Sequence, residues 1–166
     1  MVRGPVKSFS PVSAPAKSSS SDSVRAVGSP STSAAPRLSS QDYFLIVSRL
    51  VSYKKIDLAI EAFNDIGFPL KIIGSGGEKN KLKNIAKSNI EFIKDVTDEE
   101  LFKYYKNCKA LVFPGLEDFG LTMIEANYFG RPVIAYQGGG ALDIVKEGVT
   151  GEFFNGQNSK SLKKVL

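Results

Sequence analysis

The 166-residue sequence contains no histidine and only one cysteine, Cys108. Without histidine, the chain alone cannot form the usual imidazole zinc sites or a Ser-His-Asp or Cys-His catalytic group. A single cysteine excludes an internal disulfide and favours a reducing compartment. Apolar neighbours in a helical pattern indicate that Cys108 is a small buried residue rather than a reactive thiol. Any chemistry therefore depends on carboxylates, Lys and Arg side chains, backbone dipoles or a partner's residues.

The sequence also lacks a run of eighteen apolar residues, so it predicts no membrane-spanning segment. Its net charge of +5 is concentrated at one end. Residues 1–40 hold five basic residues and one acidic residue, whereas residues 41–166 hold 17 basic and 16 acidic residues. The second part is therefore close to neutral. It has no basic stripe of the kind that nucleic-acid binding requires, so we expect no nucleic-acid partner.

Residues 1–40 contain 13 Ser, 5 Pro and 5 Ala and show no apolar periodicity. Such a segment buries too little surface to offset the entropy of ordering, and we predict that it is disordered. Three origins stay open, namely a natural linker, an organelle transit peptide or an appended sequence. The folded domain is predicted to be residues 41–166.

From Tyr43 onward, apolar runs alternate with helical patterns. The runs predict buried strands at 43–49, 69–74, 90–93, 109–115, 131–136 and 151–154. Helices are expected at 55–66, 78–87, 99–108, 121–130, within 138–148, and from Ser159. Asp98 is expected to cap the third of these helices, and Gly130 to close the fourth. This alternation predicts an α/β fold, with a single Rossmann-like, doubly wound parallel sheet. Ligands bind such sheets beyond the carboxyl ends of the strands, which selects the loops 48–55, 74–78, 94–98, 114–120 and 137–141.

The loop after the first strand carries cations. Arg49 follows a buried strand directly, and Lys54 and Lys55 precede a helix. Two or three cations beside a helix N-terminus suit a diphosphate. The alternative is that the two lysines are solvated surface residues.

The second loop, "IGSGGE", holds Gly74, Gly76 and Gly77, which allow the backbone to approach a ligand closely. A dinucleotide fingerprint would need a further glycine where Lys79 stands, although Asp95 lies about where a ribose-binding acid would. A tight turn without a ligand is an equal alternative. An oxidoreductase domain built on this loop is the less favoured functional reading.

The fourth loop, in "GLEDFGLTMIEA", carries two carboxylates. Glu117 stands before the predicted helix and Glu125 about one turn inside it, among apolar residues. Two carboxylates at one pocket suggest a hydroxyl-rich ligand, because each oxygen accepts hydrogen bonds. The N–H groups at 119–121 are expected to be free at the start of the helix. The glycines of "QGGGALD" form either an anion nest or a close packing turn, and the sequence leaves both open.

Five stretches occur together in order: "VSRLVSYKKIDLAIEAF", "IIGSGGE", "VFPGLEDFGLTMIEA", "GRPVIAYQGGGALDIV" and "GVTGEFF". Together they resemble the C-terminal, donor-binding domain of the retaining glycosyltransferases of family 4, which have the GT-B fold. Glu117 and Glu125 match the Glu-x7-Glu motif of that family. The resemblance covers nearly all of residues 43–160. Within the family, the sequence is most similar to mannosyltransferases of polysaccharide assembly.

The resemblance implies roles for individual residues. Arg49 and Lys54 would bind the donor diphosphate and stabilise the leaving group, so no metal ion or other cofactor is expected. Glu117 would contact hydroxyls of the transferred sugar, and Glu125 those of the ribose. The remaining donor contacts would come from Val96 beside the base, from Gly74 and Gly76, and from the backbone N–H groups of Phe119, Gly120 and Leu121.

The resemblance also implies a larger enzyme. The chain would be the donor half, ending early in its last helices, and an N-terminal acceptor-binding domain would be missing. The donor is expected to be a nucleotide-sugar, with GDP-mannose favoured, and the acceptor a glycan or lipid-linked molecule. We expect little transfer by this chain alone and a cytoplasmic location, with a peripheral position at the cytoplasmic membrane face as an option for the full-length enzyme. A non-catalytic nucleotide-sugar binding module is the main alternative function.

Overall fold

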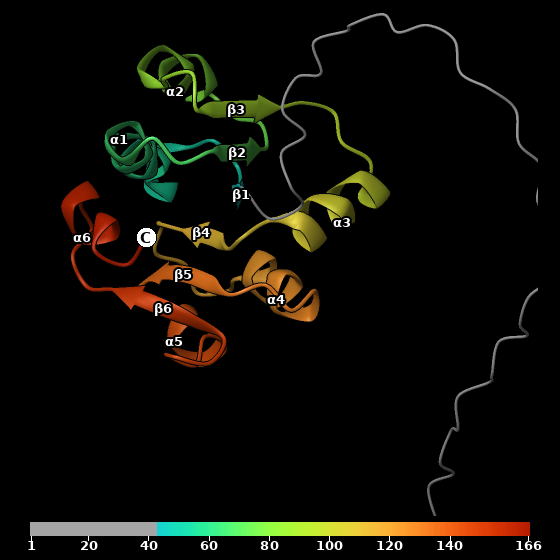
Figure 1. Ribbon diagram of the computed structural model, residues 1–166, viewed down its shortest axis with the longest axis vertical. Helices are drawn as coiled ribbons and strands as arrows, with labels where there is room; N and C mark the ends of the chain where they lie inside the picture. The colour runs from blue at the N-terminus through green and yellow to red at the C-terminus, as the bar shows by residue number, and fades with distance from the viewer. Residues whose placement is uncertain (1–42) are drawn as a thin grey trace, which may run out of the picture. The chain divides into compact units, whose positions relative to one another are not determined.

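The computed structural model describes residues 43–166, which form one parallel sheet with helices on both faces (Figure 1). The prediction made for residues 1–40 lies outside the described part of the chain. The α/β Rossmann-like architecture predicted from the alternating pattern is confirmed.

The sheet has six strands in the order β3-β2-β1-β4-β5-β6, and every neighbouring pair is parallel. The strands are β1 (Phe44–Val47), β2 (Leu70–Ile73), β3 (Ile90–Ile93), β4 (Leu111–Phe113), β5 (Val133–Tyr136) and β6 (Gly151–Phe154). The predicted runs are longer than most of these strands, because the apolar pattern continues into buried loop residues such as Pro114 and Gly115. The order reverses beside β1, and this places β1 and β4 next to each other.

Six helices and one 3-10 turn connect the strands. They are η1 (Ser52–Lys54), α1 (Ile56–Ile66), α2 (Lys79–Ile85), α3 (Asp98–Asn107), α4 (Leu121–Tyr128), α5 (Ala141–Ile144) and α6 (Ser159–Lys163). Helix α1 packs against α2 and α6, whereas α4 packs against α3 and α5. Figure 1 shows the first group and the α3–α4 pair on opposite sides of the strands.

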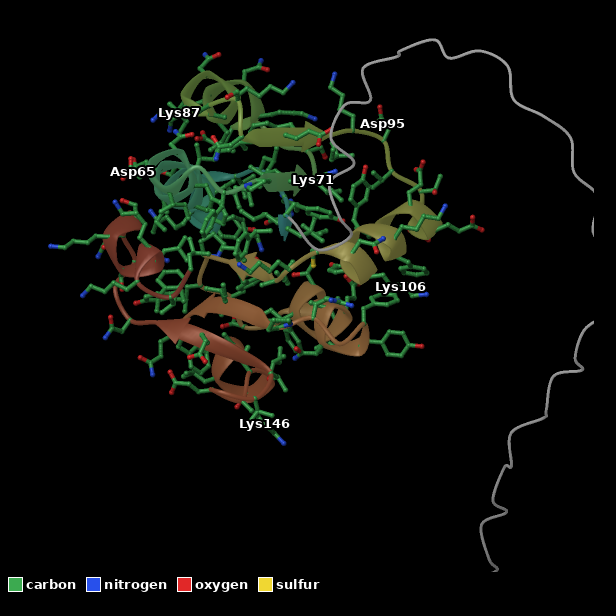
Figure 2. All side chains as sticks on the ribbon, viewed as in Figure 1. Asp65, Lys71, Lys87, Asp95, Lys106 and Lys146 are labelled. Carbon is green, nitrogen blue, oxygen red and sulfur yellow. The ribbon has the colours of Figure 1, made fainter. Side chains whose placement is uncertain are left out.

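The two faces of the sheet have separate apolar cores, because successive strand residues point to opposite faces. On one face, Phe44 and Ile46 of β1 pack beneath α1, α2 and α6. On the other, Leu45 packs with Tyr105 of α3 and Met123 of α4. The charged side chains Asp65, Lys87, Lys106 and Lys146 lie on the outside (Figure 2). No charged side chain among residues 43–166 is fully buried.

Helix α3 corrects one sequence prediction. Its N-cap is Thr97 rather than Asp98, which is the first helical residue. The Thr97 hydroxyl accepts from the Glu100 backbone N–H at 3.3 Å, and the Glu100 carboxylate accepts from the Thr97 N–H at 2.9 Å. This capping box satisfies two N–H groups, whereas Asp98 offers charge near the helix N-terminus without the cap geometry. The predicted closing role of Gly130 after α4 is confirmed by its φ of 68°.

Cys108 is fully buried, as predicted, and its burial raises the pKa of the thiol to about 11. None of the helices in residues 43–166 is both long enough and apolar enough to cross a membrane.

The capping box gives a stability prediction. Thr97→Ala removes one cap hydrogen bond, so the free energy of unfolding should fall by about 1 kcal/mol in urea titration. Ser88→Ala is the matched control, because Ser88 is exposed and lies outside the helices. Equal stability of the two variants would show that the capping box contributes nothing measurable.

Candidate functional site

A pocket opens where the strand order reverses. It has a volume of about 250 Å³ and lies at the carboxyl ends of β1 and β4. In doubly wound sheets, chain connections leave this point toward opposite faces, and the crevice between them is the usual ligand site. We call it the switch-point pocket, and its lining residues are Val47, Ser48, Arg49, Lys54, Phe113, Glu117, Phe119, Leu121 and Thr122.

Two of the predicted cations meet in the switch-point pocket. Arg49 is exposed, whereas the Lys54 side chain is only 14% exposed and forms an ion pair with Glu117. Burial, and then the nearby Arg49 charge, lower the pKa of Lys54, while the Glu117 carboxylate favours the charged amine. Lys54 is therefore not the solvated surface lysine that the sequence left open. Lys55 does not line the pocket.

Glycines on both sides hold the 114–120 loop in place. A Cβ added at Gly115 would lie only 3.0 Å from the Lys54 Cα. On the other side, a Cβ at Gly139 would overlap the Glu117 carbonyl oxygen, which also accepts from the Gly140 N–H at 2.7 Å. Of the two readings of "QGGGALD", this geometry supports a close packing turn. Its effect is to fix the backbone that carries Glu117.

Helix α4 begins at Leu121, where the sequence predicted its start. Gly120 is the N-cap, and Phe119 precedes the helix. Within the described residues, the N–H groups of these three residues donate no backbone hydrogen bond. Phe119 and Leu121 line the pocket, whereas Gly120 is buried against Met123. Two of the three residues with free N–H groups, Phe119 and Leu121, therefore lie beside the cations at the pocket, and Gly120 does not.

Glu125 lies outside the lining of the switch-point pocket. Its half-buried carboxylate accepts a hydrogen bond from the Tyr105 hydroxyl of α3 at 2.6 Å. Tyr105 was not among the site residues predicted from the sequence. The two residues are 20 positions apart on different helices, so no local spacing could have identified the pair.

Gly74 and Gly76 also lie outside the pocket lining and support it indirectly. Their φ values are 147° and 155°, and an added Cβ would overlap the carbonyl oxygens of Ser48 and Leu50. The Leu50 N–H donates to Ser75 O at 2.8 Å, and the Glu78 N–H donates to Leu50 O at 3.0 Å. The glycine loop thus holds the segment that carries Arg49.

Val96 is half-buried against the core beneath α3 and does not line the pocket. Asp95, the ribose-binding acid of the dinucleotide alternative, is exposed with a φ of 49°. Residues 43–166 contain no group of three or more His, Cys, Asp or Glu side chains that could hold a metal ion. Within residues 43–166, the switch-point pocket therefore brings together two cations, one carboxylate and backbone donors.

A family model for the glycosyl transferases group 1 matches residues 32–166. The chain belongs to this family. A glycosyltransferase of Methanocaldococcus jannaschii, the uncharacterized MJ1178, is 33% identical over 75% of this chain and 37% of its own length. Alpha-1,3/1,6-mannosyltransferase ALG2 of Dictyostelium discoideum is 28% identical over 72% of this chain and 35% of its own length. The chain thus spans about a third of each of these relatives.

The fold is shared with solved structures. Anabaena Alr3699/HepE, crystallised in complex with UDP-glucose, superposes with a TM-score of 0.66. The match is 22% identical and covers 75% of this chain and 38% of that one. The sheet therefore has the architecture expected of one half of a GT-B glycosyltransferase.

The glycine loop offers a matched pair of variants. Gly76→Ala should destabilise the fold by roughly 1–3 kcal/mol, because the new side chain meets the Leu50 backbone at an unfavourable φ. Gly77→Ala is the control, since a Cβ there has no atom within 4 Å. Urea unfolding of both variants checks the difference, and equal stabilities would contradict a packing role for Gly76.

Proposed function

We propose that residues 41–166 form the donor-binding half of a retaining, family 4 glycosyltransferase. The switch-point pocket would hold the diphosphate of a nucleotide-sugar. The observation that carries the proposal is the convergence of Arg49 and Lys54 at the point where β1 and β4 end, in a chain of the group 1 family. Two cations at this point favour an anionic ligand such as a diphosphate over a neutral ligand.

Arg49 and Lys54 would act mainly on the transition state. Negative charge grows on the diphosphate as the sugar–phosphate bond breaks, so fixed cations stabilise the transition state more than the bound donor. The exposed Arg49 can reorient toward a ligand, and Lys54 is held in place by its ion pair with Glu117. In the proposed reaction these two cations would take the place of a metal ion.

The Lys54–Glu117 ion pair suggests an order of events on binding. A diphosphate would compete with Glu117 for the Lys54 amine, because it brings more negative charge to the same cation. Glu117 would then be free to accept hydrogen bonds from hydroxyls of the transferred sugar. Backbone N–H groups at Phe119 and Leu121 lie at the same pocket and would complete the contacts.

Mannose is the proposed sugar and GDP-mannose the proposed donor. Support comes from the relationship to ALG2, which is named as a mannosyltransferase. HepE, which shares the fold, was crystallised with UDP-glucose, so a uridine donor is the nearest alternative. The acceptor would be a glycan or lipid-linked molecule bound by a further, N-terminal domain. The whole enzyme would act in the cytoplasm, and this chain alone would transfer little sugar.

A non-catalytic nucleotide-sugar binding module is a second candidate, because the chain spans only about a third of its matched relatives. The oxidoreductase alternative has less support, since its glycine loop follows β2 rather than the first strand at the switch point.

Binding should distinguish these candidates. In calorimetric titration with GDP, UDP, ADP and NAD, we expect one nucleoside diphosphate to bind and NAD to remain silent. Lys54→Ala should weaken that binding about tenfold or more, because a charge-assisted contact is worth about 1.5–3 kcal/mol.

Lys106→Ala is the matched control, because it removes the same charge from the outer side of α3 (Figure 2). Binding of NAD alone, or an unchanged affinity in Lys54→Ala, would overturn the proposal. Sugar transfer by the chain without any partner would instead refute the expected inactivity of the donor half.

A further inference from the structure

Tyr105 of α3 connects that helix to the Glu-x7-Glu segment. Its side chain is completely buried, and its hydroxyl donates to the Glu125 Oε2 atom at 2.6 Å. A bond of this length from a neutral donor to a carboxylate is in the strong range. The contact is the only hydrogen bond that the Glu125 side chain makes within residues 43–166.

The Tyr105 ring has little freedom to move. It stacks on Phe129, with the ring centroids 5.8 Å apart and the planes 13° from parallel. Burial, together with the bond to Glu125, raises the pKa of Tyr105, so the hydroxyl keeps its proton throughout the physiological range. Tyr105 is therefore a fixed donor, held by the packing between α3 and the end of α4.

Because the Tyr105 hydroxyl contacts only one carboxylate oxygen of Glu125, the other oxygen is available to a ligand. With Oε2 committed to Tyr105, the Oε1 atom of Glu125 can accept from a ligand hydroxyl. Glu125 follows Leu121 by four residues and Thr122 by three, and both of these line the switch-point pocket. Residues at such spacings share one side of a helix, so Glu125 lies one turn further along the side that faces the ligand site.

We propose that Tyr105 is a positioning residue, which holds the Glu125 carboxylate in the rotamer that receives the ribose hydroxyls of the donor nucleotide. This inference rests on the proposed function and extends it to a residue outside the motif. A free carboxylate would lose side-chain entropy on binding, whereas the Tyr105 contact pre-orders it. Tyr105 acts through Glu125 and touches no part of the donor itself.

The test compares ribose recognition with overall binding. The ligand is whichever of GDP, UDP and ADP the wild-type chain binds most tightly, together with its 2′,3′-dideoxy counterpart. Wild type should prefer the ribose form by about tenfold, as expected for hydroxyls that contact a carboxylate. Tyr105→Phe should lose most of this preference, while its affinity for the dideoxy ligand stays within about twofold of wild type.

Two further variants separate positioning from packing. Tyr43→Phe removes another buried tyrosine hydroxyl, one that donates to Tyr104 O at 3.0 Å, and should keep the ribose preference. In a Glu125→Ala background, Tyr105→Phe should have no additional effect, because both changes remove the same interaction. If Tyr105→Phe fails to fold, Glu125→Asp gives the same comparison, since it withdraws the carboxylate from Tyr105 by one methylene.

The outcomes are distinguishable. An unchanged ribose preference in folded Tyr105→Phe, or an equal loss of ribose and dideoxy binding, would overturn the positioning role while leaving the proposed function intact. An additive effect in the Glu125→Ala background would overturn it as well. Failure of the wild type to bind any nucleoside diphosphate would remove the proposed function and this inference together.

Discussion

The reversal of strand order between β1 and β4 is the constraint on which the site depends. Connections from β1 run toward β2 and β3 on one face, and those from β4 run toward β5 and β6 on the other. The connections that leave β1 and β4 diverge toward opposite faces, so a crevice is left between the ends of these two strands. Arg49 follows β1 and Glu117 follows β4, and the reversal brings these otherwise distant loops together. Backbone contacts made by Gly76 and Gly139 then keep both loops in place.

The electrostatics of the site follow from this arrangement. Among the described residues, Lys54 is the cation that is both well shielded and paired at the pocket, and its partner is Glu117. Glu125 has a different environment, because its partner is a neutral hydroxyl from Tyr105. The two carboxylates of the motif therefore have different partners. One is linked to the cations at the pocket, and the other is held in place by the neighbouring helix.

Much of the fold could be predicted from the sequence. Strands of a parallel sheet are buried on both faces, so each of them appears in the sequence as a continuous apolar run. The predicted strand at 90–93 matches β3 in full, and Lys54 lines the pocket at the carboxyl edge of the sheet, the edge that the sequence selected. Contacts between distant segments could not be predicted in the same way. Tyr105 is 20 residues from Glu125, and the collision of an added Cβ at Gly76 with Leu50 depends on how two loops meet in space.

The Thr97 cap was missed because Thr97 and Asp98 are both good cap residues, and only the local geometry distinguishes them.

The switch-point pocket is the proposed site of the donor diphosphate. A crystal structure of the chain with the nucleoside diphosphate that it binds most tightly would test this most directly. We predict phosphate oxygens at hydrogen-bonding distance, about 3 Å, from the Arg49 guanidinium and the Lys54 amine, with the Lys54–Glu117 ion pair opened. A nucleotide bound over the 74–78 loop, with the Lys54–Glu117 pair intact and no phosphate near Arg49, would contradict the account.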